Sequence, residues 1–186
     1  MQEIVIHSFE ELQKEVFRDV WDEKLKRYRN SMVYRGVADS KWGLLPSLNR
    51  LCFHDLSLEK HIIRSFKKYG YADLSHDMSF WQVLAMGQQF GLPTRLLDWT
   101  YSPLVAAHFA TEDTDFYDRD GAIICCNTSK MNRNLPESIR AILEDEGGNV
   151  FTIDMLDGFA RDFAELKAGA ERPYSLFFEP ASMVNR

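Results

Sequence analysis

The sequence has few cysteines and no segment typical of export or membrane insertion. Its three cysteines, Cys52, Cys125 and Cys126, predict no disulfide framework, because adjacent cysteines rarely bridge each other. They also include no C-x-x-C pair for zinc. The N-terminus lacks the charged and apolar regions of a signal peptide, and no apolar run approaches the ~20 residues that a membrane-spanning helix needs. We therefore expect a cytoplasmic protein that makes no membrane contact.

An excess of positive charge is also missing. Lysine and arginine total 22 against 28 aspartate and glutamate residues, so the formal net charge is −6. A protein that binds nucleic acid mainly through the phosphates normally carries a basic surface. Bulk nucleic-acid binding is therefore disfavoured, whereas a local basic pocket for one phosphate is compatible with the sequence.

The signature motifs of several enzyme classes are absent. The chain has no G-x-S-x-G, P-loop or G-x-G-x-x-G sequence, which argues against serine hydrolases, P-loop NTPases and Rossmann dehydrogenases. The five histidines are dispersed, and no pair has the helical spacing of metal ligands. We expect no metal centre.

The chain does contain enough apolar residues for a well-filled core. Hydrophobic residues make up 45% and aromatic residues 13% of its 186 positions, which suits one domain spanning 1–186. Helical and strand-like segments follow one another without the regular βαβ order of a doubly wound sheet. We therefore expect an α+β fold with a small, mixed, mostly antiparallel sheet and packed helices.

Apolar periodicity and helix-end signals predict the individual elements. Ser8 and Glu11 have the spacing of a capping box, Gly91 suits a helix stop, and Pro103 suits a first helical turn. The predicted helices cover 9–23, 58–69, 79–90, 103–110, 136–146 and 154–167. The predicted strands cover 3–7, 122–127, 174–178 and the β-prone run 31–37, where the strand is expected to end near Gly36.

Arg95 and Asp98 stand out because they are charged residues among apolar neighbours. In one interpretation they form a buried ion pair, or bond loop carbonyl groups, and hold the turn. In the other, Arg95 binds an anion, because a guanidinium group matches phosphate and carboxylate geometry. The residues alone leave both interpretations open.

Two further positions are candidates for a site. Tyr34-Arg35-Gly36 places an arginine at the end of an apolar strand, beside a glycine that would let a ligand approach the backbone. The alternative is a surface arginine beside a turn glycine. Glu179 directly follows an apolar strand, where it is either a catalytic carboxylate or a strand-end carboxylate in water.

These motifs together resemble the FRG domain, a family named for a Phe/Tyr-Arg-Gly motif that is present here at 34–36. The resemblance is strongest in 81–110, where Gln88 leads into Gly91-Leu-Pro-Thr-Arg-Leu-Leu-Asp-Trp-Thr100. It covers 1–127 well and has a weaker echo in 177–180. The family often has Gln-His where this chain has Gln88-Gln89.

Family members also tend to continue past the Phe-Glu-Pro region that this chain has at 178–180. The resemblance therefore implies that the chain is naturally short, is split, or lacks a C-terminal segment. Family members are often bacterial, and many resemble parts of phage-related or mobile-element loci.

The arrangement of the motifs is also similar to ADP-ribosyltransferase-like folds, which bind NAD. This similarity implies that Arg35 binds a pyrophosphate, that Arg95 with Asp98 and Trp99 shapes the nicotinamide side, and that Glu179 is the late carboxylate. The candidate ligand-binding residues are Tyr34, Arg35, Gly36, Gln88, Thr94, Arg95, Asp98 and Trp99, and the candidate catalytic residue is Glu179.

The motifs and the two resemblances suggest three functions. The leading one is a pocket for a nucleotide-type ligand, NAD being the first candidate, in an ADP-ribosyltransferase-like or NAD-cleaving effector of a phage-defence or toxin-like system. The second is a non-catalytic module that recognises a protein partner, with Arg35, Arg95 and Asp98 in a structural network. The third, an accessory nucleic-acid contact, is disfavoured by the negative net charge.

Overall fold

The computed structural model of the chain describes residues 3–18, 21–23, 26–28, 31–52, 57–70, 77–168, 170 and 172–180. The helices in these residues are α1 (Phe9–Val16), α2 (Ser47–Cys52), α3 (Leu58–Tyr69), α4 (Phe80–Gln89), α5 (Pro103–Thr111), α6 (Thr128–Met131), α7 (Glu137–Asp145), α8 (Ile153–Phe159) and α9 (Phe163–Lys167). The strands are β1 (Trp21–Asp22), β2 (Arg27–Tyr28), β3 (Met32–Val37), β4 (Ala122–Asn127), β5 (Phe151–Thr152) and β6 (Phe178–Glu179). Short 3₁₀ turns cover Thr114–Phe116 and Asn132–Asn134.

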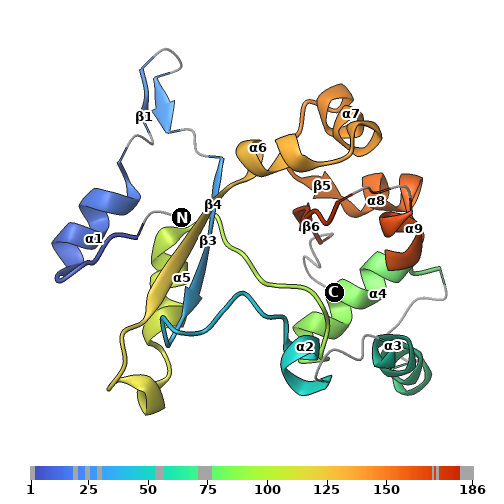
Figure 1. The fold of residues 1–186 in the computed structure, drawn as a ribbon, viewed down its shortest axis with the longest axis horizontal. Coiled ribbons are helices and arrows are strands. Elements are labelled where there is room, and N and C mark those ends of the chain that lie inside the picture. The colour runs from blue at the N-terminus through green and yellow to red at the C-terminus, as the bar shows by residue number, and fades with distance from the viewer. Residues whose placement is uncertain are drawn as a thin grey trace.

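The described strands pair into small sheets, which confirms the predicted α+β class. β1 pairs with β2 and β3 with β4, both antiparallel, whereas β5 and β6 pair in parallel. Figure 1 shows the long β3–β4 pair in the middle of the molecule beside α5, with α3, α4, α8 and α9 gathered to one side of it.

The β3–β4 pair is held against α5 by an unusually close backbone approach at Gly36. The register runs from Met32 opposite Asn127 to Val37 opposite Ala122. A Cβ atom added at Gly36 would lie 1.9 Å from the main-chain oxygen of Ala106 and 2.8 Å from the amide nitrogen of Ala110. Only glycine permits this contact, so Gly36 serves the packing of α5 on the strand.

The main core lies between α3, α4, α7, α8 and the β5–β6 pair. Its largest fully buried side chain is Trp81 on α4, whose ring packs edge-to-face on Phe163 and Phe178. The indole nitrogen donates a hydrogen bond of 2.6 Å to the main-chain oxygen of Ala160, so the one polar atom of this ring is satisfied inside the core. Phe151, from β5, is also fully buried.

Several elements match the sequence predictions closely. The strands predicted at 31–37 and 122–127 are β3 and β4, and the predicted helices at 58–69, 79–90, 103–110 and 136–146 are α3, α4, α5 and α7. Ser79 begins α4 with a full capping box: its hydroxyl accepts from the Gln82 amide at 3.3 Å, and the Gln82 side chain accepts from the Ser79 amide at 2.9 Å.

The predictions for the N-terminal segment are wrong in two respects. Residues 3–7 are not a strand: Ile4 and Val5 are exposed, and the His7 amide donates to the Glu11 carboxylate at 2.7 Å as the entry to α1. The Ser8 hydroxyl does cap the helix, accepting from the Glu11 amide at 3.1 Å. α1 ends at Val16 instead of continuing to residue 23, and residues 19–20 lie outside the described residues.

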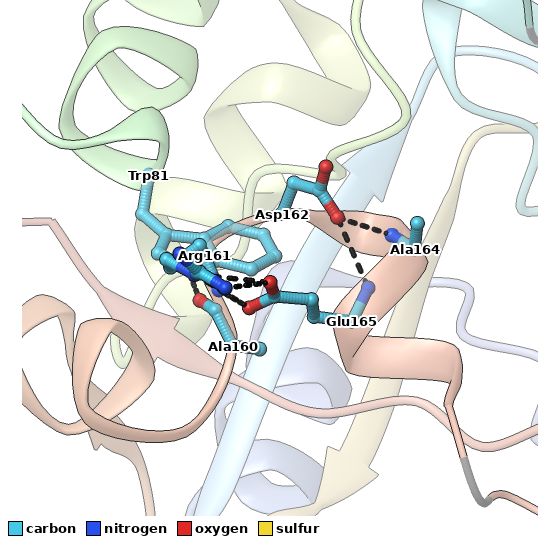
Figure 2. Close-up of polar contacts among 6 residues, drawn as sticks. All are labelled: Trp81, Ala160, Arg161, Asp162, Ala164 and Glu165. Atoms are coloured by element: carbon cyan, nitrogen blue, oxygen red, sulfur yellow. Dashed lines mark hydrogen bonds and ion pairs between the residues drawn. The ribbon is translucent and has the colours of Figure 1, made fainter.

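The helix predicted over 154–167 is also wrong, because the chain breaks after Phe159 into α8 and α9. Figure 2 shows the cause: the Asp162 carboxylate accepts from the amides of Ala164 at 2.7 Å and Glu165 at 3.0 Å. This cap starts a new helix, while the Ala160 carbonyl turns to the Trp81 indole. The apolar spacing continues across the break and therefore hides it.

The strand predicted at 174–178 is shorter and lies further along the chain. Only Phe178 and Glu179 form β6, in parallel with Phe151 and Thr152. Such a pair depends on a partner distant in sequence, which a local apolar pattern does not specify.

The described residues contain neither a membrane-spanning helix nor a cluster of metal-ligating side chains. No helix among them is long and apolar enough to cross a membrane. No group of three or more histidine, cysteine, aspartate or glutamate side chains in this part of the chain could hold a metal ion.

Candidate functional site

The segment from Gly91 to Thr100 connects α4 to α5 and brings the two motifs of the sequence together. Gly91 ends the α4 turn with a φ of +79°, a left-handed conformation that suits glycine. At the other end of the segment, Tyr34 and Thr100 exchange two main-chain hydrogen bonds of 2.8 Å. The segment therefore lies beside β3, and the Tyr34-Arg35-Gly36 motif is its direct neighbour.

Thr94 is the fully buried hydrogen-bonding centre of this segment. Its hydroxyl donates to the Gln88 side-chain oxygen and accepts from the Leu96 amide at 3.2 Å. Its main-chain amide donates to the Ser47 hydroxyl at 3.2 Å, and its carbonyl accepts from the Leu48 amide at 3.1 Å. The threonine thereby ties α4, α2 and the segment together.

Gln88 extends this network to Asp98 and Arg35. The Gln88 side-chain nitrogen donates to the Asp98 carboxylate at 3.0 Å. The Arg35 guanidinium then donates to the main-chain oxygen of Asp98 at 2.8 Å. The structure thus brings Arg35, Gln88, Thr94 and Asp98 into one hydrogen-bonded chain.

Arg95 does not join this hydrogen-bonded chain. The ion pair with Asp98 that the sequence suggested is not formed, and Arg95 pairs with Glu59 instead. The Arg95 guanidinium pairs with the carboxylate of Glu59, which is 2% exposed, and the Arg95 amide donates to the same carboxylate at 3.3 Å. The guanidinium carbon also lies 4.0 Å from the centre of the Phe163 ring, a cation–π contact. Arg95 therefore joins α3 and α9 to the segment and does not pair with Asp98.

The Arg35 guanidinium has fewer bonding partners within the described residues than that of Arg95. It is half-buried, and among the described residues its guanidinium forms no ion pair. Burial lowers its pKa, the Asp98 carboxylate acts in the opposite direction, and the nearby positive charge of Arg50 lowers it further. Arg50, exposed on α2, donates to the Leu45 carbonyl at 2.8 Å. Two guanidinium groups are thus close enough to interact at this place.

The remaining candidate residues lie around the same segment. Tyr34 is buried, and the space above Gly36 is filled by the backbone of α5. The Trp99 ring packs edge-to-face on Phe177, with ring centres 5.6 Å apart. The segment consequently contacts the C-terminal residues on one side and β3 on the other.

Glu179 lies two residues beyond Phe177 and is held by Tyr101. The Tyr101 hydroxyl donates to the Glu179 carboxylate at 2.6 Å. Burial, together with this hydrogen bond and the negative charge of Glu179, raises the pKa of Tyr101 to about 12. Tyr101 therefore stays protonated and a donor at neutral pH. Both side chains line a hollow of about 280 Å³.

Sequence reasoning missed Glu59, Arg50 and Tyr101. Glu59 did carry a signal, because it stands on the same helical stripe as Ile63 and Phe66, where an apolar residue is expected. An acid on the buried stripe of a helix needs a positive partner. Arg50 and Tyr101 have no comparable pattern in the sequence.

Comparison with known proteins gives one positive result. The family model for the FRG domain matches residues 30–119. No curated protein and no solved structure matches the chain, so the ADP-ribosyltransferase-like resemblance stays a prediction. The matched range contains β3, the Thr94 network, both arginines and α5. Residues 30–119 of the chain therefore form an FRG domain.

Proposed function

We propose that this FRG domain binds a nucleotide-type ligand, with the phosphate on Arg35. The observation that carries the proposal is the setting of the Arg35 guanidinium, which donates to a main-chain oxygen and forms no ion pair among the described residues. A guanidinium group has five N–H donors in a planar fork that matches a phosphate. Arg50 adds a second positive charge nearby.

Of the arginines in the two motifs, only Arg35 is proposed to bind the phosphate, because Arg95 is already occupied by partners in the fold. Arg95 is neutralised by a buried carboxylate and covered by an aromatic ring, so its charge is committed to the fold. An anionic ligand at Arg95 would have to displace Glu59 from the core. We therefore assign the ligand phosphate to Arg35, with Arg50 in place of Arg95 as the second cation.

Titration calorimetry with NAD, ADP-ribose and AMP tests this assignment. We expect saturable binding that Arg35→Ala weakens at least tenfold, because the phosphate loses its paired donors. Arg35→Lys should restore part of the loss, since it keeps the charge but not the fork. Arg161→Ala removes an exposed arginine at another place and serves as the matched control. Unchanged binding by a folded Arg35→Ala variant would contradict the proposal.

The catalytic form of this proposal is an NAD-cleaving or ADP-ribosyltransferase-like effector, acting in a phage-defence or toxin-like system. It requires Glu179 as the acidic group, and the Tyr101 hydrogen bond gives that carboxylate a fixed orientation. An assay of nicotinamide release from NAD separates cleavage from binding. Release that Glu179→Gln abolishes supports the catalytic form, whereas NAD binding without release supports a binding module.

A specific observation favours the second candidate, a non-catalytic recognition module. Thr94, Arg95 and Asp98 all bond to other parts of the fold, so these polar residues of the Gly91–Thr100 segment have a structural task. In that case, nucleotides do not bind in the calorimeter, and Arg35→Ala lowers the stability of the fold without removing any ligand response.

A further inference from the structure

A polar hollow lies beside the C-terminal strand, apart from the Arg35 network. It has a volume of about 280 Å³ and is lined by Ser31, Tyr101, Thr128, Asn149, Val150 and Glu179. Ser31 is four residues from Arg35, which corresponds to roughly 13 Å along an extended chain. The hollow is at the small end of ligand pockets, which typically measure ~300–1,000 Å³. It suits a group the size of one side chain.

Several polar atoms of this lining form hydrogen bonds within the protein. The Ser31 carbonyl accepts from the amide of Thr128 at 2.8 Å and from its hydroxyl at 3.0 Å. The Asn149 carbonyl accepts from the Asn132 side chain at 2.8 Å, and the Asn149 side-chain oxygen accepts from Ser129 at 3.2 Å. The walls of the hollow are therefore fixed by internal hydrogen bonds.

Glu179 is the acidic residue of the lining. One of its carboxylate oxygens accepts from Tyr101, and the other has no hydrogen bond among the described residues. Glu179 also forms no ion pair with any described residue. Among the described residues that line the hollow, it is the one formally charged side chain. Glu179 is exposed, and its carboxylate, which has no positive partner among the described residues, attracts a positive group and repels a phosphate.

We propose that this hollow binds an organic cation the size of one basic side chain, with its guanidinium or ammonium group on the Glu179 carboxylate. The aliphatic stem lies along Val150 and the Tyr101 ring, which form the apolar part of the lining. The Tyr101 hydroxyl holds one oxygen of the carboxylate, and the other faces the incoming donor. This site does not need a nucleotide at Arg35, but it uses the same Glu179 carboxylate that the catalytic form of the proposed function requires, so a bound cation would compete with that form and leave phosphate binding at Arg35 unaffected.

A titration followed by ¹⁵N NMR of the full chain tests this site. The probe is N-acetyl-arginine amide, and its uncharged counterpart, N-acetyl-citrulline amide, is the matched control ligand. We expect the arginine probe to shift the amide resonances of Asn149 and Val150, and the citrulline probe to leave them in place. Glu179→Gln should weaken binding about tenfold, because the charge-assisted hydrogen bond is lost. Asp145→Asn, a change of equal charge at an exposed position of α7, should leave it unchanged.

The same arginine presented within an octapeptide distinguishes the two sources of the cation. Tighter binding of the peptide supports a basic side chain of a protein partner, and equal binding supports a small free cation. Both results support the site. Equal shifts with arginine and citrulline, no shifts with any cation, or unchanged binding by Glu179→Gln with an intact spectrum would overturn it.

Discussion

Replacing Arg95 with alanine is expected to lower the free energy of unfolding by about 3–5 kcal/mol, the usual cost of breaking a buried ion pair. The loss arises because Glu59, at 2% exposure, would stay in the core as an unpaired carboxylate. The cation–π contact with Phe163 would disappear as well. Urea unfolding, followed by circular dichroism, measures the change.

Two comparisons show whether the buried pair is the cause. Arg161→Ala breaks an exposed pair with Glu165, which water and salt screen, and should leave the free energy of unfolding nearly unchanged. The double variant Glu59→Leu/Arg95→Met removes both charges and should recover most of the stability lost in Arg95→Ala. If Arg95→Ala costs no more than Arg161→Ala, Arg95 is not a structural arginine.

Replacing Gly36 with alanine is expected to destabilise the protein by about 3 kcal/mol, at the upper end of overpacking effects. The added methyl group would lie 1.9 Å from the Ala106 carbonyl oxygen. The nearest atoms, the carbonyl oxygen of Ala106 and the amide nitrogen of Ala110, both belong to the backbone of α5. No side-chain rotation can therefore relieve the clash. The helix would have to move off β3, and the buried surface between them would be lost.

Gly43→Ala is the matched control for this prediction. A Cβ atom at Gly43 meets no heavy atom within 4 Å, so the same change should be nearly neutral. Thermal unfolding of both variants gives the comparison. Equal melting temperatures for Gly36→Ala and the unchanged protein would show that β3 and α5 do not pack as closely as the structure has them.

The fold was predictable from sequence where local patterns decide it. Helices α3 and α4 follow their apolar periodicity, α5 begins at Pro103, and the ends of α4 follow Ser79 and Gly91. The wrong predictions concern segments whose structure is set by contacts with residues distant in the sequence. The Asp162 cap and the Ala160 contact with Trp81 break a continuous helical pattern, and β6 depends on a partner 27 positions earlier in the register.

The sequence predicted which residues form the site, but it did not predict which atoms these residues bond. The sequence selected Arg35, Arg95 and Asp98 because charges among apolar residues need partners. Which partner each of them has was not predictable. Arg95 pairs with Glu59 on helix α3, whose place on an apolar stripe signals only that it needs some positive partner, and Arg35 bonds a main-chain oxygen, which is present at every residue. The two arginines therefore look alike in the sequence and differ in the structure.

Arg35 serves a ligand whereas Arg95 serves the fold, and thermal unfolding with and without NAD tests this difference most directly. Arg35→Ala is predicted to keep a melting temperature close to that of the unchanged protein and to lose the increase that NAD produces. Glu59→Gln, which removes the charge that neutralises Arg95, is predicted to melt earlier and to keep that increase. The opposite pattern, with the NAD response lost in Glu59→Gln and retained in Arg35→Ala, would contradict the account.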